Sequence, residues 1–219
     1  MVSKTRDRLI EVARQLFVNK GVENTTMNDI AAASDKGRRT IYTYFKNKRE
    51  IFNAVVESES NAIIGQLRTI VDSDLPPVEK FRKYMSKRFD VISDTLNKPK
   101  NHIDRYRSLF SRDARRVERI YDMARKKEQS LFIELLNKGV AEGAFDKAQA
   151  ERLPSVMSLI FMTTYHFTVN SSELDSSDYD KLCNDIIDFV TNGIVTLESK
   201  KKKKQIYNNN HHRKQNKLT

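Results

Sequence analysis

Residues 34–48, SDKGRRTIYTYFKNK, combine positive charge with aromatic side chains. Five lysines and arginines and three aromatic residues fall within these fifteen positions. Cationic and hydroxyl side chains bind phosphate oxygens, and arginine and threonine can also contact base edges in the major groove. The stretch therefore predicts a polyanion-binding surface. The alternative is a solvated basic face with no binding function.

The distribution of charge supports a polyanionic partner. The chain of 219 residues has a formal net charge of +11. Residues 1–50 carry eleven basic and six acidic side chains, residues 200–219 carry eight basic and none acidic, and the part between is nearly balanced. A basic N-terminal block on a near-neutral body favours nucleic acid as the partner, with an anionic membrane as the second choice.

The residues after Gly37 form two opposite faces if they are helical. At helical spacing Ile41 and Phe45 point to one side, toward a small core, while Thr43 lies on the other side between Arg39 and Thr40. The shoulders are aromatic, and lysines follow the helix end: Tyr42, Tyr44, Lys46 and Lys48. This arrangement predicts a polar face that fits the major groove, flanked by groups that can hold phosphates.

Other kinds of chemistry have little support in the sequence. His102 and His166 have no companions at a metal-ligand spacing, and no phosphate loop, nucleophile–base pair or pair of carboxylates stands out. Cys183 is the one cysteine, so no internal disulfide is possible and a reducing compartment is expected. We interpret it as a small apolar residue, with a redox sensor as the alternative. We expect no enzymatic activity, metal or cofactor.

The N-terminus has no apolar signal-peptide core, and no segment is apolar enough to span a bilayer. We therefore expect a cytoplasmic protein that does not enter the membrane.

Hydrophobic periodicity predicts an all-α chain in which a short basic helix is one of several. Gly21 is expected to end the first helix, Thr26 to cap the second, and Gly37 to allow the sharp turn before the third. The helices are expected at about 4–19, 27–34, 38–45, 48–71, 78–96, 101–112, 114–140, 153–169 and 178–195, with Pro154 in a first turn or at a kink. Two short helices joined by a tight turn, with a third packed beneath them, form a helix-turn-helix bundle.

At these residues the chain resembles the tetracycline-repressor (TetR/AcrR) family of bacterial transcription regulators. The family motif reads roughly T-x-x-x-I-A-x-x-A-G-V-S-x-G-T-[LI]-Y-x-[YH]-F-x-[ST]-K. Nine residues match it in register: Thr26, Ile30, Ala31, Thr40, Ile41, Tyr42, Tyr44, Phe45 and Lys48. The turn is more polar and basic than the motif, since Ser34, Asp35, Lys36, Gly37 and Arg39 stand where Ala, Gly, Val, Ser and Gly are usual. A further family-like pattern, L-L-x-x-G-V-x-E-G-x-F, occupies residues 135–145.

The resemblance implies which residues contact DNA. The positions implied by the family are Thr26, Arg38, Thr40, Tyr42, Thr43, Tyr44 and Lys48. We add Arg39 from its place on the polar face, where it pairs with a guanine or holds a phosphate.

The resemblance also implies a homodimer whose last two helices form a four-helix interface. One such helix supplies Leu182, Ile186, Phe189 and Val190, and the other supplies Val156, Ile160 and Phe167. The alternative is that these apolar stripes bury only an intramolecular core. A dimer is also expected physically, because one short recognition helix reads too few base pairs to be specific.

An apolar cavity with a few polar groups is expected in the C-terminal part. The side chains that can line it are Tyr106, Phe110, Met157, Phe161, Thr164 and Tyr165. Plain core packing is the alternative for each of them.

Together these patterns predict a helix-turn-helix domain (1–47), a helical effector-binding and dimerisation domain (48–197) and a basic disordered tail (198–219). The expected function is a regulator, a repressor by preference, that a small apolar effector releases from a palindromic double-stranded DNA operator. The alternatives are a constitutive, ligand-independent or architectural DNA-binding protein, and a protein that binds anionic membranes through its lysine tail.

Overall fold

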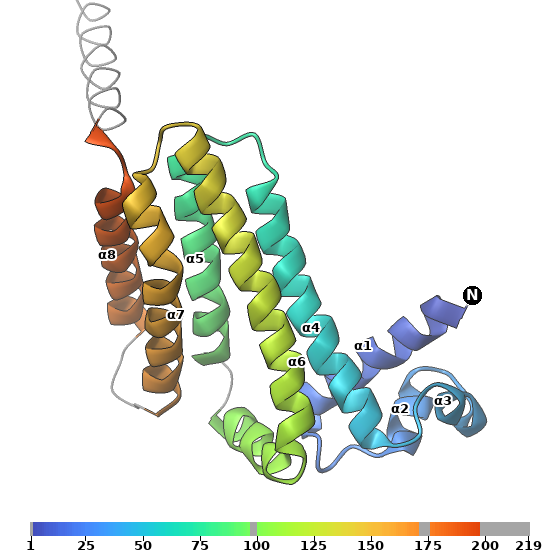
Figure 1. The fold of residues 1–219 in the computed structure, drawn as a ribbon. Coiled ribbons are helices and arrows are strands. Elements are labelled where there is room, and N and C mark those ends of the chain that lie inside the picture. Colours follow the sequence, from blue (N-terminus) through green and yellow to red (C-terminus); the bar gives the residue numbers. More distant parts are fainter. Residues whose placement is uncertain (1, 97–99, 171–175, 198–219) are drawn as a thin grey trace, which may run out of the picture. The chain divides into compact units, whose positions relative to one another are not determined.

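The computed structural model is all-α, as the hydrophobic periodicity predicts. It describes the backbone of residues 2–96, 100–170 and 176–197, and within them the side chains outside 2–3, 92, 94–96, 100–118, 121, 162–170 and 176–177. Eight helices form the described chain (Figure 1): α1 Val2–Lys20, α2 Met27–Ala33, α3 Arg38–Tyr44, α4 Lys48–Val71, α5 Pro77–Leu96, α6 Lys100–Ala141, α7 Lys147–Asn170 and α8 Ser176–Ile194.

The helices group into two compact units. The first comprises residues 1–66 and 95–128, and the second comprises residues 67–94 and 129–219. Both α4 and α6 are therefore shared between the units, whereas the predicted helix-turn-helix domain ends just before α4. The domain boundaries that we expect from function stay a prediction.

The first unit is built on the apolar faces of its N-terminal helices. Leu9 and Phe17 of α1, Ile30 of α2, Ile41 of α3 and Ile51 of α4 are all buried in one cluster. Burying each such side chain contributes about 1.5–3 kcal/mol. This small core therefore fixes α3 and the segments on either side of it, which carry the basic stretch 34–48.

The second unit has an aromatic core. The Phe81 ring lies 6.1 Å from Phe132 and 5.7 Å from Phe145, and Tyr84 stacks on Phe132 at 5.3 Å. Phe81, Tyr84, Phe132 and Phe145 are all buried. These rings fill the space between α5 and the end of α6, which run side by side in Figure 1.

The α6–α7 turn is held in the second unit by close backbone packing. A Cβ on Gly139 would overlap the Phe145 ring, and Gly143 has a φ of 71°. The turn then pairs with the end of α8, where the Asp146 N–H donates to the Ile194 carbonyl at 2.8 Å. The two glycines thus have physical reasons to stand at their positions in the 135–145 pattern.

Several predicted boundaries are confirmed. The helix predicted at 48–71 is α4, Lys48–Val71. Gly21 has a φ of 82° at the end of α1, and its N–H donates to the Phe17 carbonyl at 3.1 Å. Pro77, which has no N–H to donate, opens α5.

Two predictions about helix ends were wrong. Residues 100–141 form one helix, α6, where two were expected, because no proline or glycine interrupts the chain between Lys100 and Lys138. Helix α7 begins at Lys147, so Pro154 lies inside it and not in its first turn. The missed signal is Asp146, whose Oδ1 accepts the Gln149 N–H at 2.9 Å and caps the helix.

Candidate nucleic-acid interface

Helix α2 starts at a reciprocal cap. The Thr26 hydroxyl accepts the Asp29 N–H at 3.1 Å, and the Asp29 carboxylate accepts the Thr26 N–H at 2.8 Å. Lys20 adds an ion pair to the same carboxylate at 3.0 Å. The hydrogen bond from the Thr26 backbone, followed by the contact with Lys20, lowers the pKa of Asp29 to about 2. The cap predicted at Thr26 is confirmed, and the carboxylate stays charged at neutral pH.

The α2–α3 turn is held mainly by Ser34 and Asp35. Ser34 is buried, with its hydroxyl donating to the Ala31 carbonyl at 3.0 Å and its own carbonyl accepting from Arg8 Nε at 3.1 Å. Asp35 has a φ of 56°, whereas Gly37 has a φ of −63°. The prediction that Gly37 supplies the special conformation was therefore wrong. Asp35 supplies it, at the position where the family motif has glycine, and Asp tolerates the left-handed region better than most residues.

Helix α3 shows the two faces that its periodicity predicts. Ile41 and Phe45 are buried in the core of the first unit, while Arg39 and Thr43 are exposed on the other side. The Thr43 hydroxyl donates to the Arg39 carbonyl at 3.0 Å, which restrains its rotamer. Arg39 and Thr43 thus present hydrogen-bonding groups to solvent, while the buried Ile41 and Phe45 anchor the opposite face of the helix.

The flanks of this face are aromatic and cationic. Tyr42 is 42% exposed, and the Arg38 guanidinium lies 5.8 Å from its ring centroid. Thr40 and Tyr44 are half-buried, and Tyr44 packs against the core cluster. Of the eight side chains expected to contact DNA, Thr26, Arg38, Arg39, Tyr42 and Thr43 are exposed and the other three only in part.

Lys48 lies differently from the other seven. Its ammonium donates to the carbonyl oxygens of Val22 at 2.7 Å and of Glu23 at 3.1 Å, in the connection between α1 and α2. The side chain therefore ties the start of α4 to that connection. The expected contact of Lys48 with a phosphate stays a prediction. In the structure, Lys48 also holds the start of α4 against the α1–α2 connection.

The start of α4 carries a cap that the sequence analysis did not identify. The Asn47 side chain accepts the Glu50 N–H at 3.0 Å, and the Glu50 carboxylate accepts the Lys46 N–H at 2.8 Å. The signal was available as N-x-x-E ahead of an apolar run. This cap fixes the end of the basic stretch directly after α3.

Most of the apolar residues expected at a dimer interface are exposed or half-buried in the single chain. Phe189 is 82% exposed, Val156 50% and Leu182 45%, while Ile160 and Ile186 are half-buried. Val190 is buried in the second unit and belongs to its core. Leu159 of α7 is also exposed, and the Phe167 side chain lies outside the described residues.

The residues expected to bind an effector divide into two groups. Met157 is buried in the core of the second unit. Phe161 is half-buried, 5.3 Å from the Phe89 ring, with the Arg88 guanidinium 4.8 Å from its centroid. The remaining side chains expected at the site lie outside the described residues: Tyr106, Phe110, Thr164 and Tyr165.

Metal and redox chemistry gain no support from the described side chains. Among them no cluster of three or more His, Cys, Asp or Glu is placed to hold a metal ion. Cys183 is buried, and burial raises the pKa of its thiol, which disfavours the reactive thiolate. No helix in the described part is long and apolar enough to cross a membrane.

With this geometry in place, comparison with known proteins is decisive at the N-terminus. Residues 9–55 match the family model of the bacterial regulatory proteins of the tetR family. These residues are a helix-turn-helix of the tetR family. In agreement with the relatives described next, the chain is a DNA-binding transcription regulator and not an enzyme.

The relatives extend beyond the N-terminal helices. The HTH-type transcriptional repressor KstR2 of Mycobacterium tuberculosis is 26% identical over 144 residues, which are 66% of this chain and 70% of KstR2. The HTH-type transcriptional regulator AcrR of Shigella flexneri is 31% identical over 103 residues, 46% of each chain. A ligand-independent architectural protein is not favoured by these relatives.

Solved structures share the fold over nearly the whole chain. A transcriptional regulator from Cytophaga hutchinsonii is 24% identical, with a TM-score of 0.66 over 86% of this chain and 97% of that one. The shared fold therefore includes the C-terminal helices as well as the helix-turn-helix.

Proposed function

We propose that the chain is a dimeric repressor that binds a palindromic DNA operator through residues 26–48. The observation that carries the proposal is the exposed face of α3, where Arg39 and Thr43 project from a helix anchored by Ile41 and Phe45. Arginine recognises guanine through two hydrogen bonds, and threonine contacts bases through its hydroxyl or methyl group. The repressor role follows the relative KstR2, and its place of action would be the cytoplasm.

The dimer in this proposal uses the exposed apolar side chains of α7 and α8. Monomeric proteins rarely leave a group such as Val156, Leu159, Leu182 and Phe189 open to water. A second copy that covers them with the same residues would form a symmetric interface. Two recognition helices would then read two half-sites about one helical turn apart.

The effector in this proposal is small and largely apolar, and it binds in the second unit around Phe161. Phe161 supports this location, because it is half-buried on α7 and its ring lies 5.3 Å from the Phe89 ring. An effector releases DNA only if it binds the DNA-incompetent state more tightly. Operator DNA must then weaken effector binding by the same factor, typically about 5–150-fold.

The test has two parts. Fragments selected from native genomic DNA by the dimer should share an inverted repeat, whereas selection of unrelated fragments would contradict sequence-specific binding. A thermal-shift screen of hydrophobic compounds, followed by calorimetry with and without operator, tests the effector. A compound that binds equally well in both states is not the effector, and Thr164→Trp should block a true one or release DNA without it.

A further inference from the structure

The turn between α2 and α3 holds the backbone of Lys36 in a defined place. The Lys36 N–H donates to the Ala31 carbonyl at 3.0 Å, and the Asp35 N–H donates to the Ala32 carbonyl at 3.1 Å. Together with the positive φ of Asp35, these two bonds form a Schellman motif, an arrangement that commonly ends a helix. Lys36 is therefore fixed at the end of α2, two residues before α3 begins.

Lys36 stands where this motif favours an apolar residue. In a Schellman motif the residue at this position commonly packs on the third residue from the helix end, which here is the buried Ala31. The family motif has valine at the position of Lys36, whereas Lys36 is exposed. A residue that breaks a local packing preference in this way indicates a functional position.

The ammonium group of Lys36 is open to a partner. The Lys48 ammonium is engaged by the Val22 carbonyl at 2.7 Å. Within the described residues, no carboxylate or carbonyl engages the Lys36 ammonium in the same way. Lysine carries its charge on a flexible four-carbon stem and binds a phosphate as a point charge, so it needs no fixed orientation.

The helices on either side determine which part of DNA lies beside this turn. In helix-turn-helix complexes the N-terminal residues of the recognition helix contact base edges in the major groove, and the helix before it crosses the phosphate backbone. Arg39, at the N-terminal end of α3, is exposed for such a contact. The turn joins α2 to α3 (Figure 1), so Lys36 lies where the protein passes from the backbone into the groove.

We propose that Lys36 binds a phosphate of the DNA backbone at the edge of the groove that α3 enters. The contact is independent of sequence, because it is made to a phosphate and not to a base. It adds one cation per protomer to the binding surface, at a position where the family motif has an apolar residue. The inference rests on the proposed binding of DNA through α3, but not on the operator sequence or the effector.

Lys36→Met tests this contact on scrambled DNA, by fluorescence anisotropy of a labelled duplex at several salt concentrations. Each lost phosphate contact lowers the slope of log affinity against log salt by about 0.9, so a dimer should lose about 1.8. At about 0.1 M salt the affinity should fall at least about tenfold, for scrambled DNA and operator alike. Unchanged affinity and slope would overturn the inference. A loss confined to the operator would also overturn it, because Lys36 would then contact a base.

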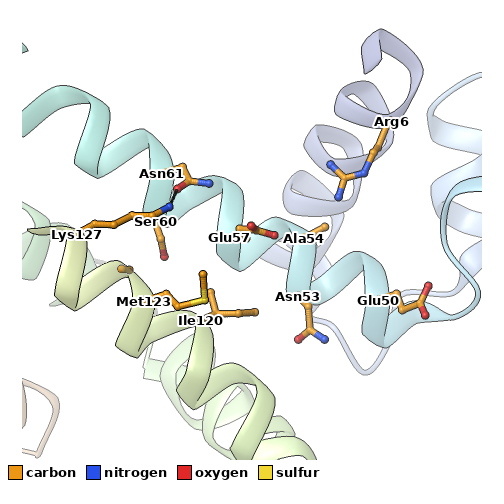
Figure 2. A pocket seen from close by; sticks show the side chains of 11 residues that line it. Arg6, Glu50, Asn53, Ala54, Glu57, Ser60, Asn61, Ile120, Met123 and Lys127 are labelled. Carbon is orange, nitrogen blue, oxygen red and sulfur yellow. Dashed lines mark hydrogen bonds between the residues drawn. The ribbon is translucent and has the colours of Figure 1, made fainter. Parts of the chain in front are cut away.

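Lys127→Met is the matched control, because it removes an equal charge from the same unit. Figure 2 shows Lys127 of α6 reaching toward Asn61 of α4, to which it donates at 3.4 Å. Asn61 lies 13 residues after Lys48, which is about 20 Å along α4 and farther than a Debye length of about 10 Å. Lys127→Met should therefore bind DNA like the wild type. An equal loss in both variants would assign the effect to net charge and overturn the inference.

Two further variants separate the charge of the turn from its structure. Lys36→Val introduces the residue of the family motif, so its melting temperature should equal or exceed that of the wild type while DNA affinity falls as in Lys36→Met. Asp35→Asn keeps a residue that tolerates positive φ and removes a carboxylate beside the expected phosphate, so affinity for scrambled DNA should rise. A lower melting temperature of Lys36→Val, or no gain in Asp35→Asn, would contradict a phosphate contact at this turn.

Failure of this inference differs from failure of the proposed function. If the wild type binds operator and scrambled DNA equally, sequence-specific repression is wrong, and the salt dependence of Lys36→Met still decides the phosphate contact. If the wild type prefers the operator and Lys36→Met has the same salt dependence as the wild type, only the phosphate contact is wrong.

Discussion

At the scale of single residues, the α2–α3 turn depends on Asp35 and not on its glycine. Asp35 has a φ of 56°, a region that costs most L-residues roughly 1–2 kcal/mol and that aspartate tolerates better. Gly37 has an ordinary φ of −63°, no atom lies within 4 Å of where its Cβ would be, and it gives α3 no side-chain cap. Position 35 therefore requires a residue that tolerates positive φ, whereas position 37 accepts an ordinary residue and would gain from one that caps α3.

Two substitutions separate these demands. Asp35→Ala should lower the free energy of unfolding by about 1 kcal/mol, because alanine is strained at positive φ. Gly37→Ser should raise it by about 0.5–1 kcal/mol, through a side-chain cap and a less flexible unfolded chain. Urea denaturation followed by circular dichroism measures both. If Gly37→Ser instead destabilises the protein, the left-handed conformation of the turn belongs to Gly37 and not to Asp35.

The outcome at this turn shows what periodicity can predict. It gave the correct faces of α3, with Ile41 buried and Thr43 exposed, because those follow from spacing alone. It could not assign the left-handed residue, because Asp and Gly both adopt that conformation and the tertiary contacts of Ser34 decide which of them does.

Lys48 is a second residue whose role depends on contacts across the sequence. Lys48→Met removes two charge-assisted hydrogen bonds to the Val22 and Glu23 carbonyls, so it should lower the free energy of unfolding by about 1–2 kcal/mol. Lys46→Met, at an exposed neighbour, is the matched control and should leave stability unchanged. Thermal denaturation distinguishes the two variants. If Lys48→Met weakens only DNA binding, Lys48 is a phosphate contact and not a tie within the fold.

At the scale of elements, the end of α6 and the following turn form one packed motif. Leu135 and Leu136 are buried, Gly139 faces the Phe145 ring, and Gly143 supplies the positive φ that ends the turn. The sequence identified this pattern by resemblance. Its physical content, the close approach of the helix backbone at Gly139 to the Phe145 ring six residues further along the chain, was visible only in the structure.

Gly139→Ala should be one of the most damaging small substitutions in the second unit. The added methyl group overlaps the Phe145 ring, which is buried against Phe81 and cannot swing away. Overpacking of this kind costs about 1–3 kcal/mol. Gly65→Ala, where no atom lies within 4 Å of the new Cβ, is the control and should not destabilise α4. Equal melting temperatures of the two variants would contradict the packing described here.

The errors in helix boundaries also belong to this scale. The division of α6 near residue 113 had no proline or glycine to support it, and the start of α7 was set by Pro154 because the Asp146 cap was overlooked. Breaks with a covalent cause, such as Pro77 after α4, were placed correctly.

At the scale of the whole molecule, the exposed apolar residues of α7 and α8 indicate a partner. Phe189→Asp replaces a side chain that is 82% exposed in the single chain, so the fold should survive while the dimer dissociates. Light scattering should give a monomer mass with unchanged helicity. Asn184→Asp, another exposed position of α8, is the control and should remain dimeric. A folded dimer of Phe189→Asp would place the interface elsewhere.

The residues of the proposed interface could be predicted only in part. The spacing of Leu182, Ile186 and Phe189 indicated an apolar stripe, but spacing alone cannot separate residues that face a partner from those that face the core. Burial in the single chain makes that distinction, and it assigns Val190 to the core.

The central claim is that the exposed face of α3 reads DNA sequence, and operator affinity measured against scrambled DNA at one salt concentration tests it most directly. Arg39→Ala and Thr43→Ala should each lose about 1–3 kcal/mol of operator affinity when the lost contact is to a base, with binding to scrambled DNA near normal for Thr43→Ala. Arg152→Ala, which removes an exposed cation of α7, should bind both DNAs like the wild type. If neither α3 variant changes operator affinity, α3 does not read the operator.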